Sequence, residues 1–360
     1  MPRVLRLGKR LCGESASAQE CGTIGRVIAF ISSPAFVEHA TGPYHPERPD
    51  RIRAIHRAVR EAGLVRSADP FPEFEIDLGP LPRSGVEAVE LAPRLATVGE
   101  LMLVHPRDHV DRVRHVCEIG GGVLDQGDTP VCPESYELAR LSAGGALIAC
   151  DAVMTGHVRR AFSAGRPPGH HAEVDRAMGF CLFANVAIGA RYLQHKYGVK
   201  KVAIVDFDVH HGNGTQAAFE ADPSVFFVSM HEHPRTCYPG SGYEWEIGVD
   251  GGRGFTMNVP FQPGAGDDEY LAALTSKVIP ALEEYGPEVL MISAGFDGHA
   301  DDPLAHIELS EDGFGRITRE LVAFADRRCA GRVVSALEGG YNLRALGRCV
   351  VRHMVELGAP

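Results

Sequence analysis

Four short runs rich in β-branched residues, in the second half of the chain, constrain its fold more than any other feature. Apolar runs of this length between polar turns are typical of strands that are buried on both faces of a sheet. Helix-like stretches at 267–285 and 311–330 separate several of the runs. This alternation predicts an α/β fold with a central, mostly parallel sheet flanked by helices in three layers. The four runs are residues 202–205, 225–228, 289–292 and 332–335.

Three helices are expected upstream of these runs. Within residues 49–63, Ile52, Ile55 and Val59 recur at helical spacing between arginines. Residues 133–155 are rich in Ala and Leu and end before a glycine, and residues 185–197 form a third helical stretch. Residues 1–25 carry four basic side chains but only short apolar runs, so we expect a poorly ordered tail rather than a secretory signal.

The composition argues against several classes of protein. The 360 residues hold 36 Lys and Arg against 47 Asp and Glu, a net charge of −11, which offers no electrostatic footprint for nucleic acid or an anionic membrane. No stretch of the sequence approaches the roughly 18 apolar residues of a membrane span. The nine cysteines form no Cys-x-x-Cys pair, so a disulfide framework and a thiolate zinc site are not indicated, and a reducing cytoplasm is the expected location.

Polar side chains concentrate directly after three of the predicted strands, in residues 206–214, 293–299 and 336–341. In open α/β sheets, ligands bind beyond the carboxyl ends of the strands. We therefore expect one chemical site that combines Asp, His and Tyr side chains from three distant segments of the chain.

Asp208, His210 and Asp297 form a candidate metal site. In extended backbone, Asp206, Asp208 and His210 point to one side, where two carboxylates and an imidazole are costly to bury without a cation. With Asp297 they offer a three-ligand set for zinc or another borderline divalent ion, with a position open for water. The alternative is that the two aspartates cap a turn and His210 is an ordinary core histidine; the second strand-end aspartate, Asp297, argues against it.

The adjacent imidazoles of His170 and His171 follow a rigid Pro-Pro-Gly turn and titrate where general acid–base catalysis operates. If Asp206 accepts from one ring and Asn213 from the other, the ring beside the carboxylate stays more cationic and the other is freer to act as a base. Tandem histidines alone are weak support for a site.

Tyr341 follows two glycines, which allow its hydroxyl to swing over a bound carbonyl and donate to a developing oxyanion. The same residues also suit a flexible turn before a helix.

Seven segments together resemble the zinc-dependent histone deacetylase and acetylpolyamine amidohydrolase superfamily, in the order of that family and over roughly residues 28–355. Asn213 stands where class I enzymes carry Asp, so the chain is similar to class II or bacterial class II-like members. The resemblance implies an arginase-like α/β fold and a single catalytic domain over residues 26–360. The segments are HPERP (45–49), RPPGHHA (166–172), MGFC (178–181), DFDVHHGNGTQ (206–216), SAGFD (293–297), DPL (302–304) and EGGY (338–341).

The resemblance also implies the bound ions. One catalytic zinc would be held by Asp208, His210 and Asp297. One or two structural potassium ions are implied in addition, held by backbone or side-chain oxygens. The first potassium set is Asp206, Asp208, His210, Ser229 and Met230, and the second is Phe219, Asp222, Val225 and Phe255.

Catalytic roles follow from the same resemblance. His171, with Asn213 as its partner, would be the general base and then the general acid. His170, paired with Asp206, would supply mainly electrostatic help. Tyr341 would donate to the oxyanion.

Six further residues are implied in substrate binding. Phe180, beside Gly179, and Tyr238 match the aromatic walls of an acyl-lysine tunnel, for which ordinary core packing is the alternative. Leu304 matches an apolar rim position. Asp128, with Asp125, resembles a loop that grips the substrate backbone in relatives.

These expectations describe a hydrolase of linear amide C–N bonds that removes acetyl or other acyl groups from protein lysines with a metal-activated water. The first alternative is an acetylpolyamine amidohydrolase with the same site. Polyamine-selective relatives place an acid where Leu304 sits, so acetyl-lysine is favoured, although Asp128 and Glu232 are expected near the rim. A non-catalytic acyl-lysine binder is a second alternative, against which Tyr341 argues. The physiological substrate, acyl chain, native metal (zinc or iron) and oligomeric state, including a homo-oligomer, are left open.

Overall fold

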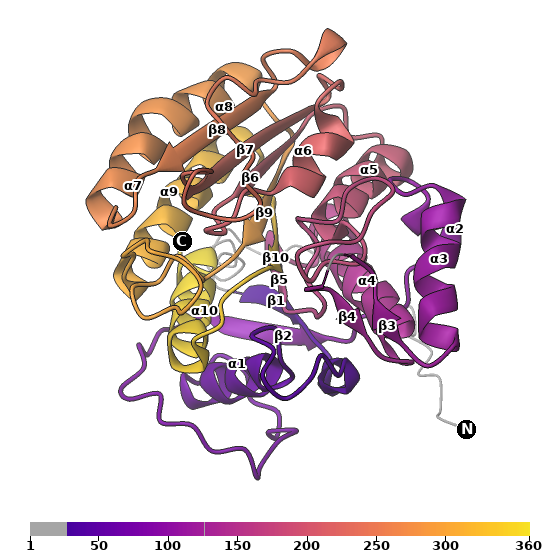
Figure 1. Ribbon diagram of the computed structural model, residues 1–360. Coiled ribbons are helices and arrows are strands. Elements are labelled where there is room, and N and C mark those ends of the chain that lie inside the picture. Colours follow the sequence, from indigo (N-terminus) through magenta and orange to yellow (C-terminus); the bar gives the residue numbers. More distant parts are fainter. Residues whose placement is uncertain (1–26, 126) are drawn as a thin grey trace, which may run out of the picture.

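A parallel β-sheet forms the centre of the computed structural model, which describes residues 27–125 and 127–360 (Figure 1). The tail expected over residues 1–25 lies outside the described residues. The strands are β1 (Val27–Ile31), β2 (Glu87–Leu91), β3 (Gly122–Val123), β4 (Pro130–Val131), β5 (Arg160–Ser163), β6 (Val202–Asp206), β7 (Val225–Glu232), β8 (Thr256–Phe261), β9 (Val289–Ala294) and β10 (Val333–Leu337). Eight of them form one sheet in the order β2-β1-β5-β10-β9-β6-β7-β8, and every neighbouring pair is parallel. The expected α/β fold is thus confirmed. β3 and β4 form a separate antiparallel pair.

Helices cover both faces of this sheet. They are α1 (Asp50–Glu61), α2 (Val98–Leu101), α3 (Arg107–Glu118), α4 (Ser135–Met154), α5 (Asn185–Tyr197), α6 (Asn213–Phe219), α7 (Asp267–Ala273), α8 (Ile279–Tyr285), α9 (Glu311–Arg328) and α10 (Leu343–Leu357). α1, α7, α8, α9 and α10 pack on one face, and α3, α4 and α5 pack on the other (Figure 1).

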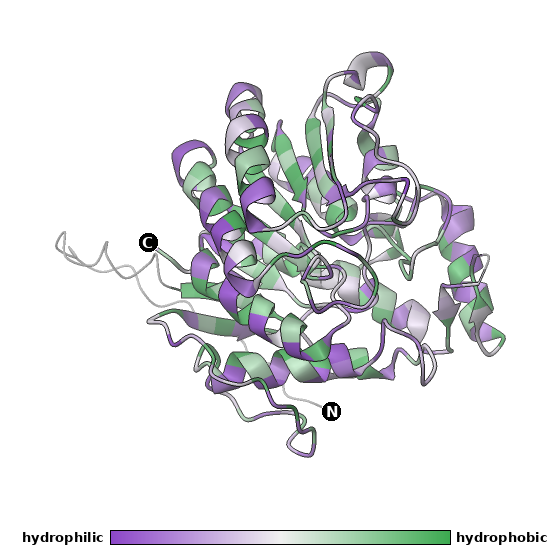
Figure 2. Cartoon of the chain, turned by 60° about the vertical axis from the view of Figure 1, so that its left-hand side comes forward, coloured by the Kyte–Doolittle hydropathy of each residue, from purple (hydrophilic) through white to green (hydrophobic). Residues whose placement is uncertain are grey.

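β6 shows how the sequence produces these layers. Its side chains alternate between the two apolar cores, with Ala203 and Val205 facing α9 and α10 and with Val202 and Ile204 facing α4 and α5. Because both faces are buried, the strand is apolar throughout, as parallel sheets require. Figure 2 shows this layering as hydrophobic strands between helices whose outward faces are hydrophilic.

The structure differs from the sequence predictions in three respects. β6 ends at Asp206, so residues 207–210 form an irregular loop rather than a continued strand. The helix expected over 267–285 is divided into α7 and α8 by a π-helical turn at Leu274–Val278. The strands β1 to β5 and β8 and the helices α2, α3, α6 and α10 were not expected.

Two further observations concern the chain as a whole. The seven cysteines in the described ranges are all free, in keeping with the absence of a disulfide pattern in the sequence. Within residues 27–125 and 127–360, no helix combines the length and the apolar character that crossing a membrane requires.

Candidate active site

The candidate site lies at the carboxyl ends of three adjacent strands, β6, β9 and β10. These strands are neighbours in the sheet, so the loops that follow them meet at the same edge. The loop after β6 carries Asp208 and His210, and the loop after β9 carries Asp297. Tyr341 follows β10. The convergence of three distant segments expected from the sequence is therefore present.

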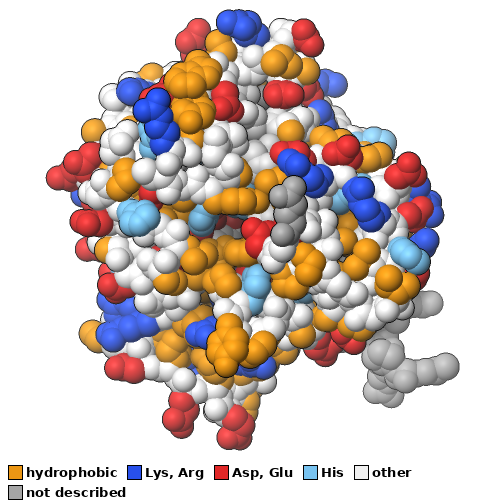
Figure 3. Space-filling model, viewed as in Figure 1, with side chains coloured by type: hydrophobic (Ala, Val, Ile, Leu, Met, Phe, Trp, Pro, Cys, Tyr) orange, Lys and Arg blue, Asp and Glu red, His pale blue; other side chains and the backbone are white. Residues whose placement is uncertain are grey.

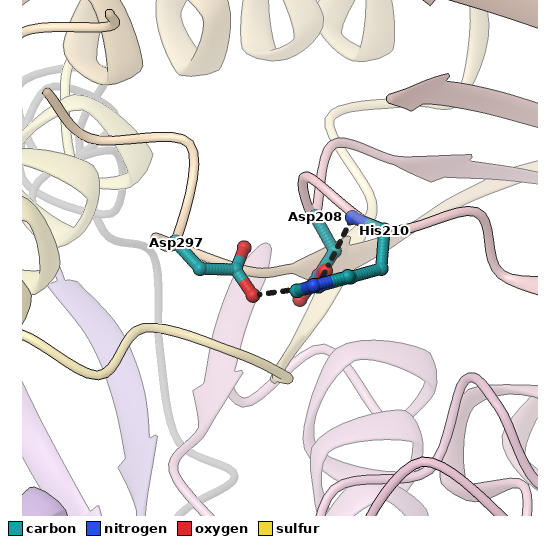
Figure 4. Close-up of side chains that lie close together, drawn as sticks. All are labelled: Asp208, His210 and Asp297. Atoms are coloured by element: carbon teal, nitrogen blue, oxygen red, sulfur yellow. Dashed lines mark hydrogen bonds and ion pairs between the residues drawn. The ribbon is translucent and has the colours of Figure 1, made fainter. Parts of the chain in front are cut away.

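Asp208, His210 and Asp297 form a buried cluster that can hold a metal ion. One ligand atom from each residue lies within 4.8 Å of the others. The Nδ1 atom of His210 is 3.1 Å from Asp208 Oδ1 and 3.1 Å from Asp297 Oδ2 (Figure 4). Two carboxylates and one imidazole suit a borderline divalent ion such as zinc, and three protein ligands leave a coordination position open.

Backbone glycines pack directly against these ligands. The N–H of Gly339 donates a 2.7 Å hydrogen bond to Asp208 Oδ2. A Cβ atom at Gly339 would overlap the carboxylate of Asp297 and lie 2.6 Å from Asp208 Oδ2. A Cβ atom at Gly295 would likewise overlap Asp208. The two glycines thus give the carboxylates the space and the hydrogen bond that keep them facing His210, which fits a metal centre.

The two adjacent histidines lie beside this cluster. His170 Nδ1 is 3.0 Å from Asp206 Oδ2, and His171 Nδ1 is 2.7 Å from Asn213 Oδ1, the two pairings expected from the sequence. The ring centroids of the two histidines are 4.0 Å apart, and those of His171 and His210 are 5.8 Å apart.

The surroundings of His170 and His171 shift the pKa values of the two imidazoles in opposite directions. Burial works to lower the pKa of His170, but the charges of Asp208 and Asp206 outweigh it and raise that pKa to about 10. Burial, together with the positive charges of His170 and His210, holds the pKa of His171 well below its ordinary value. At neutral pH, His170 is therefore cationic and His171 neutral, the arrangement that separates an electrostatic role from that of a base.

Tyr341 is held in place through its backbone. Its N–H donates to Asp302 Oδ2 at 2.7 Å, and the guanidinium carbon of Arg51 lies 5.0 Å from the centre of its ring. Burial and the charge of Asp297 raise the pKa of its phenol well above the ordinary value. The hydroxyl therefore keeps its proton and remains a hydrogen-bond donor.

A pocket of about 390 Å³ opens beside the site. We call it the mouth pocket; it is lined by Asp125, Gly127, Asp128, Arg176, Met178 and Tyr238. The ring centroids of Tyr238 and His171 are 5.0 Å apart, so this pocket adjoins the two histidines. Figure 3 shows hydrophobic side chains interspersed with acidic ones around the centre of the face seen in Figure 1.

The other expected substrate residues lie close by, with one exception. The centroid of the Phe180 ring is 5.8 Å from that of Tyr341 and 4.6 Å from that of His45. Gly179 has a φ of 56°, and a Cβ atom there would overlap the His171 ring. Leu304 is 37% exposed, and nothing in the described residues places it in the mouth pocket.

Glu232 corrects one expectation. Its side chain is buried and pairs with His306, whose backbone N–H and Nδ1 lie 2.7 and 3.1 Å from its two carboxylate oxygens. It therefore offers no charge to the rim of the pocket.

The residues of the two implied potassium sets lie near β6 and β7. Ser229 pairs with Asp206 across these strands, and its Oγ is 2.8 Å from His231 Nδ1. In the second set, the Asp222 N–H donates to the carbonyl of Phe219 at 2.9 Å, and the Asp222 carboxylate pairs with Arg191. Val225 and Met230 both lie in β7, and the carbonyl of Phe255 accepts a hydrogen bond from the N–H of Phe227 in the same strand.

Several buried charges of the site were missed from the sequence. Glu47 pairs with Arg51 and Arg166, and Glu338 accepts the backbone N–H groups of Gly169 and His170 at 2.6 and 3.0 Å. Burial raises the pKa of Glu338 to about 7. Glu47, Arg166 and Glu338 lie within segments that carry the family resemblance, so the resemblance could have identified them as residues of the site. Arg51 lies outside these segments.

Glu173, which follows RPPGHHA directly, is another residue that was missed, and it contacts Asn213.

Comparison with known proteins shows that these segments all fall within one family match. Residues 45–357 match the family described as "Histone deacetylase domain". The chain is 44% identical over 356 residues to a histone deacetylase-like amidohydrolase of Pseudomonas aeruginosa, covering 92% of this chain and 86% of that protein. It is 35% identical over 317 residues to a probable deacetylase of Archaeoglobus fulgidus, covering 88% of this chain and 82% of that protein.

A solved structure gives the same result. The chain matches the crystal structure of the HDA15 HD domain with a TM-score of 0.80 at 36% sequence identity. The match covers 90% of this chain and 89% of that one.

Proposed function

Because the chain belongs to the histone deacetylase family, we propose that it is a zinc-dependent amidohydrolase that removes acetyl or other acyl groups from lysine side chains of proteins. One observation supports this most. The buried cluster of Asp208, His210 and Asp297 adjoins a neutral histidine, His171, whose ring centroid lies 5.8 Å from that of His210. A metal site beside a base is the arrangement that hydrolysis by an activated water requires.

Asp208, His210 and Asp297 are the residues that would hold zinc. When bound, the ion would supply a Lewis acid for the amide carbonyl and would lower the pKa of a water molecule. Potassium in the two sets described above, single-domain organisation over residues 26–360 and a cytoplasmic location stay proposals as well.

His171 is proposed as the residue that moves the proton. With Nδ1 turned to Asn213, its Nε2 is the nitrogen free to remove a proton from the attacking water and to return it to the leaving amine. His170, cationic beside Asp206, contributes positive charge next to the reaction.

Tyr341 is proposed as the oxyanion donor. Its phenol keeps its proton, and Arg51 and Asp302 hold its ring and its backbone. A preorganised donor of this kind acts where negative charge develops on the carbonyl oxygen.

The substrate is proposed to enter between Phe180 and Tyr238. Aromatic walls suit the uncharged methylene chain of an acylated lysine. Gly179 allows the backbone to approach His171, and Asp128 lies at the mouth to accept backbone N–H groups of a peptide. Leu304 is proposed as an apolar contact further out.

An acetylpolyamine is the second candidate substrate. Asp125 and Asp128 both line the mouth pocket, where their charge suits a distal ammonium group. Burial and the neighbouring Asp125 raise the pKa of Asp128 to about 6, so most of this carboxyl group is still ionised at neutral pH.

One experiment tests the proposal and separates the substrates. Zinc-loaded protein is assayed with acetyl-lysine peptides, peptides with longer acyl chains and acetylputrescine, before and after treatment with a chelator. We expect hydrolysis of the peptides to exceed that of acetylputrescine, to stop on chelation and to return with zinc. Hydrolysis that persists in metal-free protein would contradict the metal role, and acylated substrates bound without hydrolysis would indicate a binding protein.

A further inference from the structure

We infer that Glu173 is a positioning residue for the reaction. It fixes the orientation of the Asn213 amide and, through that amide, the nitrogen of His171 that carries the proton. This inference rests on the proposed function, because it concerns how His171 is prepared to act as a base.

The side chain of Asn213 makes three contacts that support this inference. Asn213 Nδ2 donates to Glu173 Oε1 at 2.8 Å, and Asn213 Oδ1 is 2.7 Å from His171 Nδ1. Asn213 Nδ2 also lies 3.4 Å from the sulfur of Met178, a weak acceptor. The side chain of Asn213 is thus placed between an acceptor on one side and an imidazole on the other.

The carboxylate of Glu173 determines how the Asn213 amide is oriented and which nitrogen of His171 carries the hydrogen. An ionised carboxylate accepts hydrogen bonds and donates none, so the NH₂ group of Asn213 must face Glu173. The amide oxygen then faces His171, and because this oxygen only accepts, Nδ1 of His171 must carry the hydrogen. Nε2 is left with a lone pair, which is what a general base requires.

The opposite orientation of Asn213 would reverse this outcome. The two ends of an amide have nearly the same shape, so packing alone does not select between them. With NH₂ turned to His171, Nδ1 would have to accept, and the hydrogen would move to Nε2. His171 could then no longer remove a proton from water.

Glu173 is itself held in place at the edge of the pocket. Its Oε2 accepts from Arg176 Nη2 at 2.9 Å, and its backbone N–H donates to the carbonyl of Arg176 at 2.9 Å. Arg176 lines the mouth pocket. A chain of contacts therefore runs from the pocket mouth through Arg176, Glu173 and Asn213 to His171.

Kinetics of three variants give the first test. Glu173→Met removes the acceptor, and we expect it to lower kcat about 10- to 100-fold, the range for partners that orient active-site groups, with little change in KM and in zinc content. Glu173→Gln keeps an acceptor oxygen, and we expect it to restore kcat to within about threefold of the wild type. Glu137→Met is the matched control, because Glu137 forms a comparable pair with Arg140 on the exposed side of α4. Full activity of Glu173→Met would overturn the inference.

A second comparison separates orientation from a merely structural role. In Asn213→Asp, the residue facing Nδ1 of His171 is a carboxylate, which accepts in either orientation. Removing Glu173 in that background also relieves repulsion between two neighbouring carboxylates. We therefore expect Glu173→Met to raise kcat or leave it within about threefold when Asn213→Asp is present. An equal loss in both backgrounds would overturn the inference.

The tautomer can also be read without any substrate. In protein with ¹⁵N-labelled histidine, with His171 assigned by the spectrum of His171→Gln, we expect hydrogen on Nδ1 in the wild type and a mixture of tautomers in Glu173→Met. The same tautomer in both proteins would overturn the inference. If the wild type hydrolyses no acylated substrate, the proposed function fails, while this measurement still decides whether Glu173 orients Asn213 and His171.

Discussion

The carboxylate of Glu47 accepts hydrogen bonds from both Nε and Nη2 of Arg166, which lies 119 positions further along the chain. Arg51 adds a third hydrogen bond to the same carboxylate at 3.0 Å, and all three side chains are buried. Arg51 also donates to the carbonyl of Gly340 at 2.7 Å. The charge cluster therefore connects the first helix to the loop that presents Tyr341.

Replacing Glu47 tests the energetic weight of this cluster. Glu47→Gln leaves two buried guanidinium groups without a counter-charge, so we expect it to lower the free energy of unfolding by about 3–5 kcal/mol. Urea denaturation measures the change. Glu87→Gln is the control, because its pair with Arg66 is exposed and the expected loss is about 1 kcal/mol or less. Equal losses in the two variants would contradict the argument.

Gly339→Ala tests the packing of the metal ligands. The added methyl group would overlap Asp297 and displace Asp208, so we expect zinc affinity to fall about 10- to 100-fold. Metal content after dialysis against a weak chelator measures the effect. Gly99→Ala is the control, since the nearest atom to its Cβ is at 3.9 Å and the site is distant in the sequence. Zinc retention equal to that of the control would show that the glycine is not required.

Tyr341→Phe tests the proposed oxyanion donor. Loss of the hydroxyl removes one hydrogen bond to the developing charge, so we expect kcat to fall about 10²- to 10³-fold while KM changes little. Steady-state kinetics on an acetyl-lysine peptide measure both constants. Tyr197→Phe, which removes a hydroxyl that bonds Asp151 instead, serves as the control. Near-normal turnover of Tyr341→Phe would remove Tyr341 from the mechanism.

His353 predicts how stability depends on pH. It is fully buried between Thr318 and Ser335, and burial lowers its pKa to about 3. Between about pH 3 and pH 6.5 the unfolded chain therefore binds a proton at this residue that the folded protein does not. Its contribution to stability is present above pH 6.5 and is lost as the pH falls.

The comparison with His353→Gln isolates this effect. We expect the free energy of unfolding of the wild type to fall more steeply than that of the variant, by about 1.4 kcal/mol per pH unit, as the pH drops from 6 to 4. Denaturation curves at several pH values give the two slopes. Parallel slopes would mean that His353 is protonated in the folded protein.

Much of the site could be predicted because its residues follow buried strands. β6, β9 and β10 are apolar runs, and their carboxyl ends must meet in a parallel sheet. The pairings of His170 with Asp206 and of His171 with Asn213 were implied by the family resemblance, and the structure contains both.

Three of the other strands could not be predicted because their local sequence does not resemble their structure. β8 contains Pro260, which fits only because this strand lies at the edge of the sheet. β5 begins with Arg160, whose charge is buried against Asp326 from a distant helix. β2 is an edge strand that carries two glutamates. Each of these strands is stabilised by contacts with other segments of the chain: β8 with β7, β5 with Asp326 and β2 with β1.

Glu173 illustrates the same limit within the site. A glutamate two positions after the tandem histidines has no local signature that distinguishes it from a solvent-exposed acid. Its function depends on Asn213, 40 positions further on, and only the folded chain brings the two together.

The uniform strand direction also has a practical consequence. The turns that lead into β6 and β9 contain Gly198 and Gly286, have open space around these glycines and lie at the end of the sheet opposite the mouth pocket. A fluorescent label or an affinity tag inserted at either turn would point away from incoming substrate. Engineering at that end leaves the chemistry of the opposite end unobstructed, so the protein can be immobilised there for assays.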